Sequence, residues 1–161
     1  MRTIASTILF ATILLGGAAA QELTIAVSHY GSFGLNDLDG QLPVSGELRF
    51  SLPISDRFAL EPFVTAGSEQ GRRRAGSEGF YGAQIRQRLR RLTSPSRYAF
   101  VTYGAAGYYS TSGAYPPVIG FFGVGMQQGI SKRVSFRPEV QLISFHVVPI
   151  GYRLVAGVAV H

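Results

Sequence analysis

The chain has 161 residues, no cysteine and no tryptophan, and its 15 basic and 9 acidic side chains give a formal net charge of +6. The absence of cysteine excludes disulfides and thiolate metal sites. The 20 glycines, 8 tyrosines and 11 phenylalanines favour strands and turns over helices.

The first predicted element is an export signal over residues 1–20. Arg2 precedes an apolar stretch from about Ile8 to Leu15, and Ala18-x-Ala20 fits a signal peptidase site. A permanent membrane anchor is the alternative, but it would need about 20 predominantly apolar residues, and this stretch is shorter. Cleavage leaves one domain, residues 21–161, which has 161 − 20 = 141 residues and a formal charge of +5 because Arg2 is lost.

Eight stretches of alternating apolar and polar side chains follow, the pattern of strands with two different faces. They cover 23–30, 44–52, 58–67, 80–89, 98–109, 118–127, 134–144 and 152–161. A tilted strand that crosses a bilayer needs about 9 to 11 residues, whereas strands of soluble proteins peak near five or six. The pattern predicts an all-β fold, an eight-stranded antiparallel up-and-down transmembrane β-barrel.

The connections alternate in length. Tight turns are expected at 55–57 and 131–133, and longer links at 31–43, 68–79, 110–117 and 145–151. Outer-membrane barrels have short periplasmic turns and long outer loops, which this order matches. The link at 90–97 is the exception, since it is long and should be periplasmic. Residues 54–62 also resemble 130–138, which is expected if similar hairpins converge on similar turns; an internal duplication is the alternative.

The segment Ile130–Leu142, ISKRVSFRPEVQL, resembles the turn-and-strand signature of small outer-membrane barrels of the OmpA and OmpX type. The resemblance in strand pattern covers all of residues 21–161. It implies a bacterial outer-membrane location, contact with outer-membrane lipids and lipopolysaccharide, and insertion by the barrel-assembly machinery. A monomer with no nucleic-acid partner is expected. The signature marks architecture and not activity.

Charged side chains within the strands should face the barrel interior, because a charge in hydrocarbon costs several kcal/mol. An eight-stranded barrel is only wide enough for its side chains to fill. We therefore expect an ion-pair network that plugs the lumen, with a narrow, porin-like, anion-preferring pore as the alternative. The predicted network has three acids and five bases: Glu47, Arg49, Glu61, Arg86, Arg88, Arg137, Glu139 and Arg153.

Aromatic side chains cluster near the predicted strand ends, as expected of rings at membrane interfaces. Tyr30, Tyr81 and Tyr109 fall near the outer end, and Tyr98 and Phe100 near the inner end.

The predicted loop 68–79 carries Arg72, Arg73 and Arg74 between glycines. Three guanidinium groups outside the membrane would bind the phosphates of an anionic glycolipid or a sulfated glycan. The alternative is a solvated loop without a ligand.

An enzyme is not expected, and neither a metal nor a cofactor is predicted. A lipid A-modifying hydrolase, the alternative, needs a serine, a histidine and an acid in hydrogen-bond reach. His29 and His146 fall near the outer rim, with Ser28, Ser32, Ser144, Asp37 and Asp39 close in sequence, but the His-x-Ser arrangement of deacylase barrels is absent. A soluble lipocalin-like carrier is a further alternative, and it would require apolar side chains inside the barrel.

Overall fold

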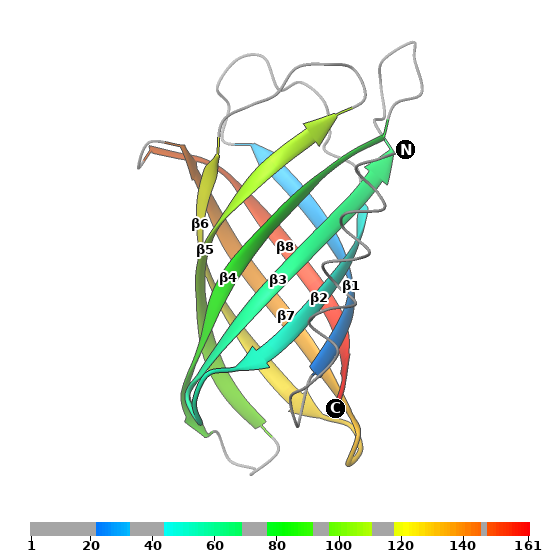
Figure 1. The fold of residues 1–161 in the computed structure, drawn as a ribbon, viewed down its shortest axis with the longest axis vertical. Helices are drawn as coiled ribbons and strands as arrows, with labels where there is room; N and C mark the ends of the chain where they lie inside the picture. Colours follow the sequence, from blue (N-terminus) through cyan, green and yellow to red (C-terminus); the bar gives the residue numbers. More distant parts are fainter. Residues whose placement is uncertain (1–21, 33–43, 69–76, 92–96, 111–117, 146–147) are drawn as a thin grey trace.

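The structure, a computed structural model, is a closed barrel of eight antiparallel strands (Figure 1). It describes residues 22–32, 44–68, 77–91, 97–110, 118–145 and 148–161. The strands are β1 (Glu22–Ser32), β2 (Ser45–Pro53), β3 (Phe58–Ser68), β4 (Ser77–Arg91), β5 (Arg97–Ser110), β6 (Ile119–Gly129), β7 (Val134–Phe145) and β8 (Val148–Val160). Each pairs with its neighbours in sequence, and β1 closes the barrel on β8. The predicted all-β barrel, strand count and order are confirmed.

Strand boundaries differ most at β8, which was expected to start at Tyr152 and starts at Val148. Pro149 favoured a loop, because proline cannot donate to a sheet ladder. In the structure Pro149 lies opposite Ser144 of β7, next to a register shift between Ile143 and Ser144. Such an irregularity accommodates proline inside a strand.

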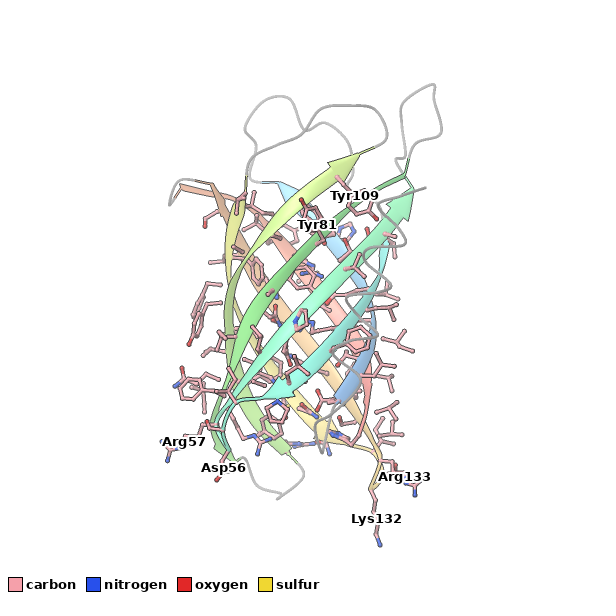
Figure 2. All side chains as sticks on the ribbon, in the orientation of Figure 1. Asp56, Arg57, Tyr81, Tyr109, Lys132 and Arg133 are labelled. Carbon is pink, nitrogen blue, oxygen red and sulfur yellow. The ribbon has the colours of Figure 1, made fainter. Side chains whose placement is uncertain are left out.

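The turns β2–β3 and β6–β7 lie at the same end of the barrel and share one hydrogen-bond pattern (Figures 1 and 2). Ile54 N and Ser55 N both donate to Phe58 O, at 2.9 and 3.0 Å. Ile130 N and Ser131 N donate to Val134 O in the same way, at 2.8 and 3.0 Å. The two resembling segments therefore form equivalent hairpin turns on opposite sides of the barrel.

The outer surface of the strands is apolar. Alternation places aliphatic and aromatic side chains outward, where they are about half exposed. They include Ile25, Val27, Leu48, Tyr81, Tyr103, Phe122, Val124, Phe136, Val140, Leu142, Leu154 and Val158. Among the described residues, no helix is long and apolar enough to cross a membrane. The exposed apolar side chains form a band around the barrel, which suits a lipid environment.

The interior holds the core, and it includes aromatic rings that were expected at the membrane interface. Tyr30, Tyr98 and Phe100 point inward and are almost fully buried, so the prediction is wrong for these three. Each of them occupies an inward-facing position of its strand, because a ring at a strand end follows the same alternation as the rest of the strand. Tyr81, in contrast, is 57% exposed on the outer face (Figure 2).

Candidate functional site

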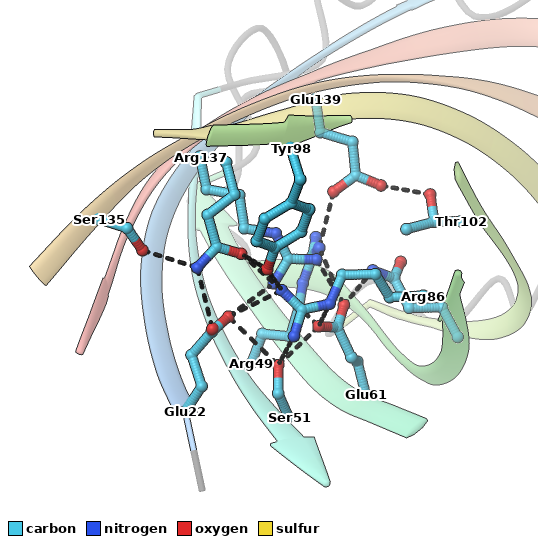
Figure 3. Close-up of polar contacts among 12 residues, drawn as sticks. Glu22, Arg49, Ser51, Glu61, Arg86, Tyr98, Thr102, Ser135, Arg137 and Glu139 are labelled. Carbon is cyan, nitrogen blue, oxygen red and sulfur yellow. Dashed lines mark hydrogen bonds and ion pairs between the residues drawn. The ribbon is translucent and has the colours of Figure 1, made fainter. Parts of the chain in front are cut away.

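Ion pairs between buried arginines and glutamates fill the middle of the lumen (Figure 3). Glu61 of β3 is fully buried and accepts two hydrogen bonds from Arg137 of β7, from NH1 at 2.9 Å and NH2 at 2.6 Å. Arg86 Nε lies 3.0 Å from the same carboxylate. Ser51 and Gln84 donate to it as well, at 2.6 and 2.7 Å. The contacts to Glu61 join strands across the lumen and do not only link neighbours.

Arg49 of β2 extends this network toward the end of the barrel opposite the β2–β3 and β6–β7 turns. It pairs with Glu47 at 2.5 Å and with Glu139 at 2.7 Å, and lies 3.5 Å from Glu61. Arg153 of β8 forms an ion pair with Glu47 and donates to Gln141 at 2.9 Å. Glu139 also accepts a hydrogen bond from Thr102. A removed charge would leave several buried partners uncompensated.

Two residues change the composition that the sequence predicted. Glu22, which was missed, is buried and lies 3.1 Å from Arg86 and 3.2 Å from Arg137. Glu22 lies on the same face of β1 as the buried Thr24. Extending the predicted alternation of this strand by one residue would therefore have placed Glu22 inside. Arg88, which was predicted to belong to the network, is exposed at the mouth of the lumen and stacks on the Tyr98 ring at 4.2 Å.

The corrected network is balanced in charge. Among the described residues it has four acids and four bases: Glu22, Glu47, Glu61 and Glu139 with Arg49, Arg86, Arg137 and Arg153. Arg88 takes part in none of the ion pairs that the described residues form. The excess of bases that suggested an anion-preferring pore is therefore not present within the network.

An aromatic cluster fills the lumen beyond the ion pairs, at the end opposite the two turns. Phe63 and Phe121 meet edge to face at 5.6 Å, and Tyr30 stacks on Phe80 at 4.9 Å. Ala106, Ile119 and Ile143 complete the cluster. The Arg153 guanidinium lies 5.3 Å from the ring centres of both Tyr30 and Phe63, and so connects the cluster to the ionic layer.

Two inward-facing glycines of β6 make room for this filling. A Cβ on Gly125 would collide with the Phe100 ring, and one on Gly123 would lie 2.6 Å from Thr102 Oγ1. The Phe100 ring in turn carries the Arg137 guanidinium at 4.7 Å. Small residues on β6 thus let large side chains from β5 and β7 meet in a narrow barrel.

The lumen opens at the end with the two turns into a vestibule of about 1170 Å³. Side chains of several strands and both turns form its walls, among them Glu22, Ser51, Asp56, Arg57, Arg86, Arg88, Tyr98, Gln127, Lys132, Ser135 and His161. The vestibule ends at the ion-pair network, because Glu22 and Arg86 belong to both.

Other predicted residues lie apart from the lumen or outside the described residues. Arg72, Arg73, Arg74 and His146 are outside the described residues, as is the predicted export signal. His29 is exposed on the outer face of β1, whereas Ser28 is buried on the inner face. Within the described ranges no group of three or more metal-ligating side chains is placed to hold a metal ion.

No protein-family model matches the chain, and no curated protein matches it in sequence. Solved structures do match in fold. Neisserial surface protein A has a TM-score of 0.63 at 12% identity, covering 87% of this chain and 94% of that one. The Yersinia pestis attachment invasion locus protein, Ail, bound to the heparin analogue sucrose octasulfate, has a TM-score of 0.50 at 16% identity, covering 86% and 95%. The N-terminal β-barrel domain of Pseudomonas aeruginosa OprF has a TM-score of 0.54 at 10% identity, covering 86% and 96%. The chain therefore has the fold of the small eight-stranded outer-membrane β-barrels.

Proposed function

We propose that this protein is an integral outer-membrane barrel with a closed lumen and a structural or surface-interaction role. In this proposal residues 1–20 direct export and are removed, residues 21–161 form the barrel, and the β2–β3 and β6–β7 turns face the periplasm. The apolar outer band and the fold of its structural neighbours support this location. The barrel contacts outer-membrane lipids and lipopolysaccharide, is inserted by the barrel-assembly machinery and acts as a monomer.

The observation that carries the closed lumen is the two-layer filling. The ion pairs span the lumen from β2, β3 and β4 to β7, and the aromatic cluster lies above them. A solute would have to separate buried charges and then pass between packed aromatic rings, and both steps are costly. The cavity within the aromatic cluster holds about 10 Å³, which is about the space that one water molecule needs.

Conductance in a planar lipid bilayer tests this proposal. The purified barrel should insert without discrete current steps, and its folded state should be checked by a shift in gel mobility between unheated and boiled samples. A steady, ohmic, anion-selective current from folded protein would refute the closed lumen. The absence of a gel shift, with the protein recovered in a soluble periplasmic extract, would refute the membrane location.

We further propose that Arg72, Arg73 and Arg74 bind an anionic glycolipid or sulfated glycan at the cell surface. The argument is chemical, because guanidinium groups bind phosphate and sulfate through paired hydrogen bonds. The structural neighbour Ail was crystallised with a sulfated heparin analogue, which makes this ligand class a reasonable first choice. A role as a solvated loop is the alternative outcome.

Binding to heparin beads and to vesicles with lipopolysaccharide tests the loop. Replacing the three arginines by serine should weaken retention at physiological salt. The matched control replaces three exposed bases of the inner turns, Arg57, Lys132 and Arg133, by serine and so removes the same charge. Equal retention of the two triple variants would refute a role for this loop.

The rival functions have less support. A hydrolase at the outer rim would use His29 or His146, and His146 lies outside the described residues. The His29 side chain faces outward while Ser28 faces the lumen, on the opposite side of the same strand. A lipocalin-like carrier needs an apolar lumen with space for a ligand, whereas charged side chains occupy the middle of this one.

A further inference from the structure

Three side chains at the inner end of the lumen lie in the order serine, histidine, carboxylate. Ser135 Oγ of β7 is 3.1 Å from His161 Nε2, and His161 Nδ1 is 3.4 Å from Glu22 Oε2 of β1. They come from the ends of three adjacent strands: β7 and β8 are consecutive, and the closure of the barrel pairs β1 with β8. The backbone N–H of His161 donates to Arg133 O at 2.9 Å, which holds the ring over the lumen.

The surrounding hydrogen bonds determine which group donates. The Gln127 amide oxygen accepts from Arg86 NH1 at 2.7 Å and also from the Tyr98 hydroxyl, so its nitrogen must be the donor. That nitrogen donates to Ser135 Oγ at 2.7 Å. The Ser135 hydroxyl proton is then free to point at His161 Nε2, which the Gln127 amide nitrogen also approaches at 3.4 Å. An Nδ1 proton on His161 would face Glu22 Oε2 at 3.4 Å, an ion-pair distance. This is the tautomer that a general base on serine requires.

The contacts of Glu22 fix its carboxylate in a position where it can orient the His161 ring. Its Oε1 atom faces Arg86 at 3.1 Å and Arg137 at 3.2 Å, while Oε2 faces His161 and accepts from Gln127 at 3.0 Å. The two arginines fix the orientation of the carboxylate. A buried, fixed carboxylate next to the histidine stabilises the imidazolium that forms during proton transfer.

The three groups line the open vestibule of about 1170 Å³, and a substrate would reach Ser135, which is 2% exposed, past the His161 ring. The His161 side chain is 42% exposed, and Ser135 lies behind it. The exposed charges around them are mainly basic, with Arg57, Arg88 and Lys132 against Asp56. Such a wall favours a substrate with a negative charge.

From this geometry we propose that Ser135, His161 and Glu22 form a hydrolytic triad that cleaves small carboxylic esters with an anionic group. The site goes beyond the structural role proposed above, and it lies toward the opposite end of the barrel from His29.

The reaction needs only the ester and water. Ser135 Oγ attacks the ester carbonyl carbon and its proton passes to His161 Nε2, while the carbonyl electron pair moves to oxygen. One N–H of the Gln127 amide donates to Glu22, and the other, which donates to Ser135 Oγ, can turn to this oxyanion as Oγ becomes an ester oxygen. The bond from carbon to the leaving oxygen breaks, and His161 returns the proton to the released alcohol. Water then attacks the acyl-Ser135 in the same way and releases the carboxylic acid, which restores Ser135.

The test measures hydrolysis of mono-4-nitrophenyl succinate and of neutral 4-nitrophenyl butyrate by the folded barrel in detergent micelles. We expect Ser135→Ala and His161→Gln each to lower the rate about 100-fold or more, the usual range for loss of a nucleophile or its base. Ser28→Ala is the matched control, because Ser28 is a buried inward serine of β1 that lies outside the vestibule walls. Its rate should equal that of the unchanged protein, and the anionic ester should be the better substrate.

Labelling provides a second measurement that does not depend on a variant folding. A fluorophosphonate should modify the unchanged protein at Ser135, identified by mass spectrometry of peptides, and pre-incubation with the anionic ester should slow the labelling. Hydrolysis no faster than that of folded Ser135→Ala, or labelling spread evenly over the exposed serines, would overturn the triad. Hydrolysis with a clear preference for the neutral ester would overturn the assigned substrate class.

Discussion

The contact between Glu61 and Arg137 should be the most strongly coupled pair in the barrel. Both side chains are about 99% or more buried, and they share two short hydrogen bonds. Removing one partner of a buried pair costs about 3–5 kcal/mol, because the other charge stays buried and uncompensated. Glu61→Gln should leave the lumen with one excess positive charge, and Arg137→Met with one excess negative charge.

The double variant tests the reasoning more sharply than either single change. It leaves three acids and three bases, so the lumen is neutral again. If charge balance is what matters, its loss of stability should be smaller than the sum of the single losses by about 2 kcal/mol, within the range measured for residues in direct contact. Glu61→Gln combined with Arg57→Met is the control, since Arg57 is exposed in the β2–β3 turn.

The measurement is urea-induced unfolding of the barrel in phospholipid vesicles, followed by far-UV circular dichroism and by the folded band on unheated gels. The free energies of unfolding of the four proteins in each cycle give the coupling directly. A coupling under about 0.5 kcal/mol for Glu61 with Arg137, equal to that of the control cycle, would refute a charge-balanced lumen.

Three further outcomes follow from the same structure. Val124→Arg, outward in the middle of β6, should cost about 2–4 kcal/mol of unfolding free energy, whereas Ile130→Arg, in the turn at the barrel end, should cost about 0–1 kcal/mol; equal costs would contradict a membrane-facing band. Gly125→Ala should destabilise the barrel by about 1–3 kcal/mol, because the added methyl group meets the Phe100 ring, and unchanged stability in urea would show that the ring moves aside. Ser131→Ala should lower the urea midpoint by an amount equivalent to about 1 kcal/mol. The reason is that the Ser131 hydroxyl accepts two backbone N–H bonds in the β6–β7 turn, at 3.2 and 3.1 Å. An unchanged midpoint would mean that water fully replaces the hydroxyl group.

The sequence alone was enough for the number and order of the strands and for the face on which most side chains lie. Side-chain alternation is a local property, since neighbours in a strand point to opposite sides whatever the strand pairs with. It placed Arg49, Glu61, Arg137 and Arg153 inside from their own strands. The length of each alternating stretch could likewise be predicted without any knowledge of the strand it pairs with.

Only the tertiary structure decided which inward side chains meet. The level of each one along the barrel axis depends on strand tilt and register, which alternation does not contain. Glu22 therefore joins the network from the first residue of β1, and Arg88 leaves it at the rim, where a register shift follows between Arg88 and Arg91. The approach of Glu22 to His161 has the same origin, because β1 pairs with β8 only when the barrel closes, whereas Ser135 lies on β7, the direct neighbour of β8.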